Sequence, residues 1–278
     1  MSDLQRAPIG VFDSGYGGLT VLRELVRTLP DYDYLYLGDN ARAPYGTRSF
    51  DTVHRFTLQC VRYLFDRGCP LVILACNTAS AKALRTIQQL DLPAMDDPTR
   101  RVLGVIRPSA EAVGELTRTR RVGVLGTPGT VKSASYVLEI AKLFPDISVY
   151  QEACPMWVPL VENGEHASPG AAYFVRQHVE RLLGQCPEID TVILGCTHYP
   201  LLEPVIRDCL PPDVRLVSQG EIVASSLADY LQQHPAMAAR LTRHGERAFV
   251  TTDDAEVFNH QAAGFFGEEV RSQSIVLG

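Results

Sequence analysis

Two of the seven cysteines, Cys76 and Cys196, stand where a thiol could do acid and base chemistry. Each follows a short apolar run typical of a buried strand, and each precedes small polar residues. Ligands bind at the carboxyl ends of strands in open α/β sheets, and the start of a following helix favours a thiolate over a thiol. An unperturbed thiol titrates at about 8.5, so a modest shift would make it a general base and, when protonated, a general acid.

Polar side chains that could hold a substrate occur at the same strand ends and in the turns that follow them. They combine hydroxyl and amide groups, which can stabilise a developing carbanion, with two titratable groups that can accept a proton from a thiol or a substrate ammonium. Because no pyridoxal phosphate is invoked, these donors would have to supply the stabilisation themselves. The set is Asp13, Ser14, Asn77, Thr78, Thr130, Thr197 and His198.

An internal repeat relates the two cysteines. IGVFDSG at residues 9–15 is echoed by VGVLGTPG at 122–129, and VILACNT at 72–78 is echoed by VILGCTH at 192–198. Two equivalent lobes that face each other would put the thiols on opposite sides of one cleft. That geometry suits a reaction that removes a proton from one face of a carbon and returns one to the other, such as inversion at the α-carbon of an amino acid.

The elements that must position these residues alternate between strands and helices. This alternation predicts an α/β fold of two pseudo-symmetric, doubly wound lobes with mostly parallel sheets and a cleft between them. Strands are expected at 8–12, 32–37, 71–74, 102–105, 121–125, 147–150, 191–194 and 214–217. Helices are expected at 20–29, 49–66, 78–90, 109–116, 131–143 and 169–183.

Proline-rich stretches suggest where the lobes divide. Residues 93–100 read as a linker, and a Pro pair at 211–212 ends the second copy of the repeat. The remaining 66 residues, 213–278, are too few for a third core and are expected to pack on the first lobe. We therefore expect a first lobe of residues 1–98 plus 213–278 and a second lobe of 99–212.

The composition of the 278 residues restricts the function classes. Hydrophobic residues make up 46% and charged residues 21%, with a net charge of −6, which argues against binding to nucleic acid or to an anionic membrane. Neither a secretory signal nor a membrane-spanning run is visible, so a cytoplasmic protein is expected. The cysteines form no C-x-x-C pair and the histidines show no metal-ligand spacing, so we expect no metal.

The simplest alternative for each cysteine is a buried structural thiol, the usual state of a free cysteine. The equivalent places of Cys76 and Cys196 in the repeat favour catalysis instead. The turn at 13–18 could hold a phosphate, but it lacks the P-loop pattern and carries an acid. The other cysteines lack such settings and are expected to be structural; they are Cys60, Cys69, Cys154, Cys186 and Cys209.

Six motifs in order make the chain resemble the glutamate racemase family, within the wider aspartate/glutamate racemase superfamily. They extend over nearly the whole chain. The motifs are FDSGYGG at 12–18, GDNARAPYG at 38–46, ACNTA at 75–79, GTPGT at 126–130, VPLVE at 158–162 and LGCTHYP at 194–200.

The resemblance implies a two-base interconversion of L- and D-glutamate that needs no cofactor and supplies D-glutamate for peptidoglycan synthesis. Cys76 would act on the α-proton of D-glutamate and Cys196 on that of L-glutamate, with Asp13 and His198 as their respective auxiliary groups. The resemblance also implies a homodimer. Asp39 and Glu162 match supportive acidic positions, and the implied substrate contacts are Asp13, Ser14, Pro44, Tyr45, Gly46, Asn77, Thr78, Thr130, Cys196 and Thr197.

Two kinds of alternative function remain open at this point. One is another isomerase of the superfamily, such as an aspartate or hydantoin racemase or a maleate isomerase; an arylmalonate decarboxylase would need only one cysteine. The other is a bilobal protein that binds an acidic amino acid without converting it. Ligand-induced stabilisation without loss of optical activity would identify such a binding protein.

Overall fold

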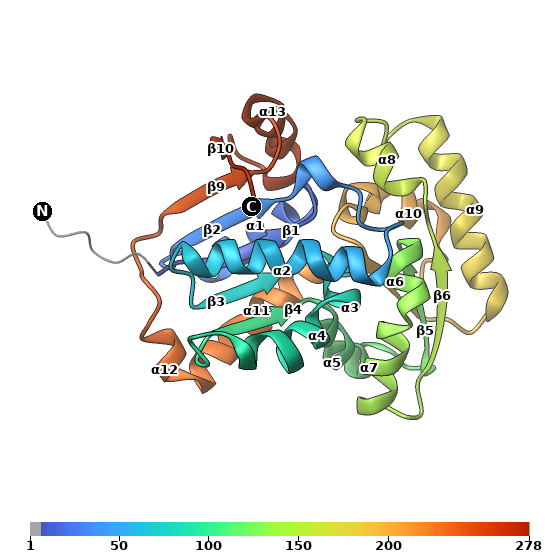
Figure 1. Cartoon of the computed structure of the whole chain (residues 1–278). Coiled ribbons are helices and arrows are strands. Elements are labelled where there is room, and N and C mark those ends of the chain that lie inside the picture. Colours follow the sequence, from blue (N-terminus) through green and yellow to red (C-terminus); the bar gives the residue numbers. More distant parts are fainter. Residues whose placement is uncertain (1–6, 278) are drawn as a thin grey trace, which may run out of the picture.

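Two β-sheets, both parallel within the described residues, form the framework of the protein (Figure 1). The structure is a computed structural model that describes residues 7–277. Its strands are β1 (Ile9–Asp13), β2 (Tyr34–Gly38), β3 (Leu71–Leu74), β4 (Arg101–Gly104), β5 (Arg121–Gly126), β6 (Ser148–Ala153), β7 (Thr191–Gly195), β8 (Arg215–Val217), β9 (Arg247–Thr251) and β10 (Ser272–Ser274). The strand order is β10-β9-β2-β1-β3-β4 in the first sheet and β6-β5-β7-β8 in the second.

The strand orders confirm the internal repeat. The four strands β2-β1-β3-β4 correspond one to one with β6-β5-β7-β8, so β1 matches β5 and β3 matches β7. Residues 9–13 and 122–126, which carry the first echo, lie in β1 and β5. The second echo ends β3 and β7, so Cys76 and Cys196 follow equivalent strands of the two sheets.

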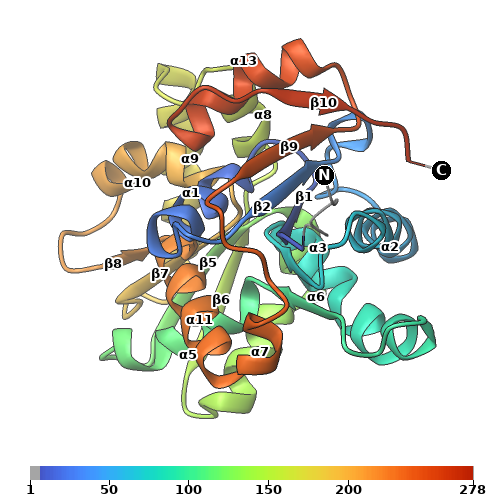
Figure 2. The same ribbon diagram turned by 90° about the vertical axis from the view of Figure 1, so that its left-hand side faces the viewer.

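Helices cover both faces of each sheet (Figures 1 and 2). They are α1 (Leu19–Thr28), α2 (Phe50–Asp66), α3 (Asn77–Lys82), α4 (Leu84–Thr86), α5 (Ile106–Leu116), α6 (Pro128–Ser133), α7 (Ser135–Leu143), α8 (Trp157–Glu162), α9 (Pro169–Gln185), α10 (Glu203–Cys209), α11 (Gln219–Gln233), α12 (Pro235–Ala238) and α13 (Ala255–Phe266). In the first sheet α2 contacts β1 and β3, while α1 packs against α11 and α13. In the second sheet α9 contacts β6 and α10, and α5 packs against α7 and α11.

The burial of the strands explains why their sequences are nearly continuous apolar runs. Every residue of β1, β3 and β7 is buried, as expected for parallel strands with helices on both faces. The mixed α/β class with parallel sheets is therefore confirmed. Two long helices begin at serine caps: Ser49 caps α2 and Ser168 caps α9 through side-chain oxygens that accept backbone N–H groups.

The predicted lobe boundaries are displaced by one strand at each end. β4 falls in the predicted second lobe, yet it pairs with β3 in the first sheet. β8 falls in the predicted first lobe, yet it pairs with β7 in the second sheet. Each strand completes the sheet of the repeat copy before it, so the proline stretches at 93–100 and 211–212 mark connections inside a copy. Further on, β9 pairs with β2 and brings the C-terminal segment to the first sheet.

Two expected helices differ in detail. The region 78–90 begins as α3 but continues through α4 into a π-helical turn, Ile87–Asp91. The region 131–143 is divided between α6 and α7 at Ala134, whose φ of 52° is left-handed and interrupts the helix.

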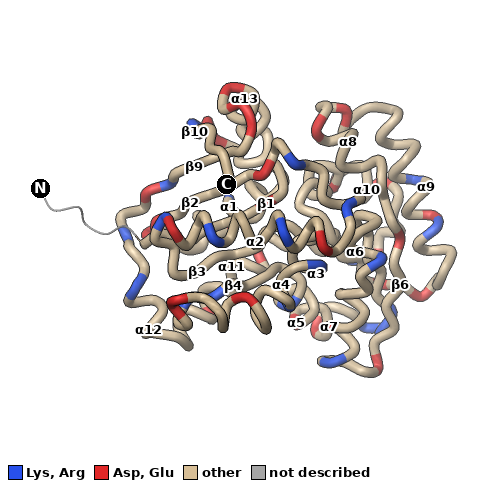
Figure 3. Tube along the Cα trace, in the orientation of Figure 1, with Lys and Arg blue, Asp and Glu red and all other residues tan. Residues whose placement is uncertain are grey.

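Charged residues of both signs are distributed along the outer helices and connections (Figure 3). In the described part of the chain, no helix combines the length and apolar character required to cross a bilayer.

Candidate active site

Cys76 lies between β3 and α3, and its side chain caps the helix. The backbone N–H of Ala79 donates to Cys76 Sγ at 3.4 Å, and Ser14 Oγ lies 3.4 Å from the same sulfur. The side chain of Cys76 is 5% exposed. The predicted strand end and helix start therefore hold this thiol in a buried polar turn, in contact with the turn after β1.

The surroundings of Cys76 keep its thiol protonated. Burial raises the pKa to about 12, and the Asp13 carboxylate adds to this, while the hydrogen bonds from Ser14 and Ala79 act in the opposite direction. The neighbouring Cys196 also raises the pKa. The helix start alone does not produce a thiolate, so Cys76 needs a nearby proton acceptor before it can act as a base.

Cys196 has a different partner set, because a histidine lies beside it. His198 Nδ1 is 3.9 Å from Cys196 Sγ, and His198 Nε2 is 3.0 Å from Glu162 Oε1. Burial opposes protonation of His198, but the Cys196 sulfur and the Glu162 carboxylate outweigh burial and raise its pKa to about 10. The three side chains form a chain of acid–base groups from the end of α8 to the second thiol.

Glu162 is the last residue of α8. The helix end directs its carboxylate to the imidazole of His198, where it forms an ion pair when the histidine is protonated.

Asp13 joins the two strand-end regions. It ends β1, is fully buried, and accepts hydrogen bonds from the Gly15 N–H at 2.9 Å and from Thr197 Oγ1 at 3.5 Å. Burial raises the pKa of Asp13, and the charge of His198 opposes that effect. Gly17 permits this contact, because a Cβ at that position would overlap the side chains of Thr197 and His198. The turn after β1 and the turn after β7 are therefore packed directly together.

Threonines link the turns after β3 and β5. Thr78 Oγ1 lies 3.0 Å from Thr127 Oγ1, which is 3.1 Å from Thr130 Oγ1. Thr127 also caps α6 by accepting the backbone N–H of Thr130. Thr127 was not among the predicted residues, although the repeat aligns it with Ser14 and could have identified it.

Asp39 lies at the base of the 44–46 loop. Its carboxylate accepts hydrogen bonds from Arg42 Nε at 2.7 Å, from Thr252 Oγ1 at 2.9 Å and from the Tyr45 hydroxyl. These partners belong to the loop and its supports, so the structure places Asp39 where it shapes the loop. Gly46 in turn packs on Thr127, since a Cβ on Gly46 would lie 3.0 Å from Thr127 Cβ. The loop thus reaches the second sheet's side of the site.

Asn77 is held by two residues that the sequence analysis did not identify. Asn77 Nδ2 donates to Gln219 Oε1 at 2.6 Å, and the Tyr136 hydroxyl donates to Asn77 Oδ1 at 2.7 Å. Both partners lie in the first turns of helices far along the chain, Tyr136 in α7 and Gln219 in α11, and no local motif distinguishes them.

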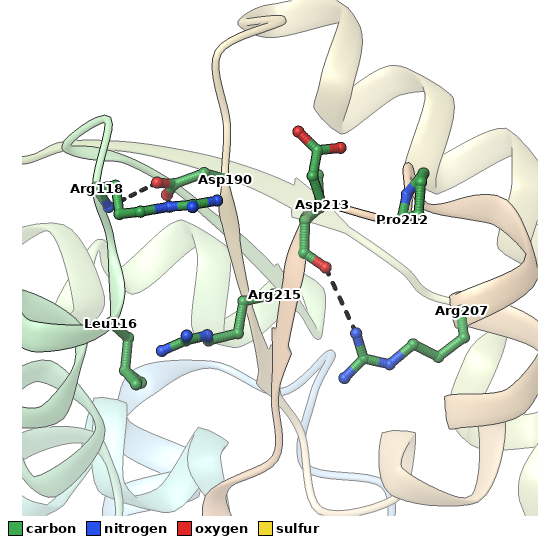
Figure 4. Close-up of a pocket in the computed structure, with 8 residues that line it drawn as sticks. Leu116, Arg118, Asp190, Arg207, Pro212, Asp213 and Arg215 are labelled. Carbon is green, nitrogen blue, oxygen red and sulfur yellow. Dashed lines mark hydrogen bonds between the residues drawn. The ribbon is translucent and has the colours of Figure 1, made fainter.

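A separate pocket of about 340 Å³ lies at the other end of the second sheet (Figure 4). Asp190 precedes β7 and Arg215 begins β8, so the pocket is at the amino ends of the strands that carry the site at their carboxyl ends. Its lining residues are Leu116, Arg118, Asp190, Arg207, Pro212, Asp213, Val214 and Arg215. None of the predicted site residues lines it.

Among residues 7–277, no group of three or more His, Cys, Asp or Glu side chains has an arrangement that could hold a metal ion. The chemistry that the described residues can perform themselves is proton transfer by two thiols. Each thiol has titratable and hydrogen-bonding neighbours, which is the arrangement expected of an acid–base enzyme.

The protein is thus an α/β protein with parallel sheets and two buried thiols at equivalent strand ends. The chain belongs to the Asp/Glu/Hydantoin racemase family, whose family model matches residues 9–227. It is 41% identical over 272 residues to the glutamate racemase of Ruegeria pomeroyi, covering 94% of this chain and 97% of the relative.

Solved structures of glutamate racemases are also similar to this chain. The glutamate racemase isoform RacE1 from Bacillus anthracis superposes with a TM-score of 0.88 and 36% identity, covering 98% of both chains. The glutamate racemase of Francisella tularensis, solved in complex with D-glutamate, superposes with a TM-score of 0.86 and 33% identity over 99% of both chains.

Proposed function

We propose that this enzyme interconverts L- and D-glutamate without a cofactor and supplies D-glutamate for peptidoglycan synthesis. The observation that carries the proposal is the pair of buried thiols, Cys76 and Cys196, at equivalent strand ends. The turn after β1 contacts both of their turns, through Ser14 beside Cys76 and through Asp13 beside Thr197. The near full-length similarity to glutamate racemases supports glutamate as the substrate. The Francisella tularensis relative binds D-glutamate, the compound we propose here as one of the two substrates.

The proposed reaction moves one proton at each thiol. In the D-to-L direction the Cys76 thiolate takes the α-proton, and the electrons of the broken C–H bond remain on the carbon as a carbanion. The Cys196 thiol then gives its proton to the opposite face of that carbon and forms L-glutamate. The enzyme is left with a thiol at Cys76 and a thiolate at Cys196, which is the state that starts the reverse reaction.

Each thiol needs a different auxiliary group. The pKa of Cys76 is raised to about 12 by burial and by the Asp13 carboxylate, so Cys76 must lose its proton to an acceptor. We assign Asp13 as that acceptor, since its own raised pKa makes it a stronger base. We assign protonated His198, held by Glu162, to stabilise the thiolate at Cys196.

The substrate is proposed to lie among the polar groups of the facing turns. The helix starts of α3 and α6 present backbone N–H groups, which suit the two carboxylates of glutamate. Asp39 is proposed to fix the 44–46 loop, which carries three of the proposed substrate contacts. The proposed substrate contacts are Asp13, Ser14, Pro44, Tyr45, Gly46, Asn77, Thr78, Thr130, Cys196 and Thr197.

The larger organisation is also a proposal. We propose two lobes, each built on one sheet. The first comprises residues 1–98 together with β4 and the chain after β8, and the second comprises the chain from α5 to β8. A cytoplasmic location is supported by seven cysteines that are all free thiols, as expected in a reducing compartment. A homodimer follows from the resemblance and is tested by light scattering of the purified protein.

The circular dichroism of D-glutamate with purified enzyme and no added cofactor tests the proposed function. The signal should decay to zero with wild-type enzyme. Cys76→Ser and Cys196→Ser should each slow the decay by at least about 10³-fold, because a hydroxyl is a far weaker acid and base at these positions. Cys186→Ser is the matched control, since Cys186 is 7% exposed and precedes β7, whereas Cys196 follows the opposite end of that strand.

An unchanged signal with folded, reduced wild-type enzyme would remove glutamate as substrate. Aspartate, maleate and hydantoins would then be tested in the same assay. Full turnover by either site variant would contradict the two-thiol mechanism even if glutamate is racemised.

A further inference from the structure

A buried ring of hydrogen bonds lies directly behind the Cys76 turn. Asn77, the residue after Cys76, donates to Gln219 Oε1 at 2.6 Å; Gln219 Nε2 donates to the Tyr136 hydroxyl at 2.6 Å; and the Tyr136 hydroxyl donates to Asn77 Oδ1 at 2.7 Å. The exposed fractions of the three residues are 2%, 4% and 0%. Because buried polar atoms need hydrogen-bond partners, the three side chains hold one another in place.

The ring is anchored on its far side. Gln219 Nε2 also lies 2.8 Å from Ser109 Oγ and 3.2 Å from the Val105 carbonyl, and the Ser109 hydroxyl donates to that same carbonyl at 2.9 Å. Because carbonyls can only accept, the Gln219 amide has one orientation that satisfies this set. That orientation turns its oxygen toward Asn77, so the side chain of Asn77 is fixed by residues from α5, α7 and α11.

Tyr136 also contacts the other thiol's turn. A Cβ built on Gly195, the residue before Cys196, would lie 3.3 Å from Tyr136 Cε2. The tyrosine ring therefore packs on the last residue of β7, while its hydroxyl bonds to the first residue of α3. One fully buried side chain touches the chain neighbours of both cysteines, and burial together with the nearby Cys196 raises the pKa of Tyr136, so its hydroxyl stays a donor.

We propose that Tyr136 and Gln219 are positioning residues that fix the two thiols relative to each other. The inference rests on the proposed two-thiol function and deepens it. Tyr136 spans the two turns, and Gln219 orients both Tyr136 and Asn77. Proton transfer requires the donor and acceptor to be held within tenths of an ångström, and a displacement of about 1 Å can cost about a hundredfold in rate.

The test uses Tyr136→Phe and Gln219→Met, each close in shape to the native residue. Their kcat/KM for racemisation should fall by about tenfold or more. Since D- and L-glutamate are equally stable, kcat/KM must fall equally in both directions. The isotope effect with α-deuterated substrate separates the two thiols, because the slower transfer becomes more rate-limiting.

Two different isotope patterns are expected. Gln219→Met disturbs the Asn77 side, so the deuterium effect should rise mainly with the enantiomer that Cys76 deprotonates, proposed to be D-glutamate. Tyr136→Phe loosens both turns, so the deuterium isotope effect should rise with both D- and L-glutamate. Gln88→Met makes the same substitution away from the thiols and serves as the control; Gln88 is exposed, and its Nε2 donates to the Val102 carbonyl.

The outcomes separate this inference from the proposed function. Wild-type enzyme that does not racemise glutamate overturns the function itself. Active wild type with folded variants that keep wild-type kcat/KM and isotope effects overturns the positioning role. A lowered melting temperature with unchanged kcat/KM and isotope effects would show that Tyr136 and Gln219 are ordinary core residues and would also overturn it.

Discussion

The two thiols face different immediate environments although they follow equivalent strands. Cys76 has a serine hydroxyl and a backbone N–H beside it, while Cys196 has an imidazole whose other nitrogen is bound to Glu162. Burial raises the pKa of the first thiol to about 12. The second thiol has a cation available at neutral pH, because the pKa of His198 is raised to about 10. The repeat therefore conserves position while the proton chemistry differs between its copies.

Glu162→Gln is predicted to shift the alkaline side of the pH profile. The variant removes the carboxylate that holds His198 protonated, so the pKa of His198 falls and the histidine loses its charge at lower pH. The basic limb of kcat/KM should move to lower pH accordingly. The shift is measured by recording kcat/KM at pH values on both sides of 10, near the raised pKa of His198 in the wild-type enzyme.

The same substitution has a consequence for stability. A histidine with a raised pKa stabilises the fold fully below its ordinary value of 6.5, and this contribution is lost as the pH rises through about 10. In Glu162→Gln, the free energy of unfolding should therefore decrease less than in wild type as the pH rises from 6.5 to about 10. Glu165→Gln, an exposed neighbour, should behave as wild type; an identical pH response in both variants would refute the role of the Glu162–His198 pair.

At the scale of elements, a buried acid holds the 44–46 loop in shape. Asp39 is fully buried and accepts hydrogen bonds from Arg42 and Tyr45, and Gly46 packs on the turn after β5. These hydrogen bonds fix the conformation of the loop, which we propose faces the substrate.

Asp39→Asn is predicted to raise KM for glutamate more than it lowers kcat. The neutral amide weakens the bond to Arg42, so the loop must be ordered by the substrate. A tenfold rise in KM would correspond to about 1.4 kcal/mol of binding energy. Steady-state kinetics with Asp51→Asn, an exposed acid in the first turn of α2, provide the comparison. A pure kcat defect would instead indicate that Asp39 takes part in proton transfer.

Apolar runs predicted eight of the ten described strands, because buried parallel strands carry continuous apolar residues. β9 and β10 were missed for the same physical reason. The first two residues of β9 are exposed, and β10 is a short polar edge strand of sequence SQS, so neither has a run to detect. The displaced lobe boundaries had another cause, since proline marks a turn without showing which sheet the next strand joins.

The residues of the candidate site could be predicted where they lie together in short sequence motifs. The cysteines, their following residues and the Asp13–Ser14 turn lie in short motifs at strand ends. Tyr136 and Gln219 could not be predicted, because their partners lie 59 and 142 positions away and their own helices show no unusual pattern. Long-range hydrogen bonds of this kind leave no local signal.

For the molecule as a whole, duplication of one strand order places two thiols at equivalent positions. The four equivalent strands give each copy a strand followed by a cysteine, and contacts such as Thr197 to Asp13 and Thr78 to Thr127 join the copies at the turns that follow. A single-thiol enzyme would need only one such turn. The duplication supports our proposal that each face of the substrate has its own thiol.

The most direct test of that claim is proton NMR of D-glutamate racemisation in D₂O, read at low conversion. Two thiols on opposite faces predict that newly formed L-glutamate carries solvent deuterium at the α-carbon while the remaining D-glutamate keeps its α-proton. Loss of the α-proton from unreacted D-glutamate as fast as L-glutamate forms would mean that one group serves both faces. That result would contradict the assignment of Cys76 and Cys196 to separate proton transfers.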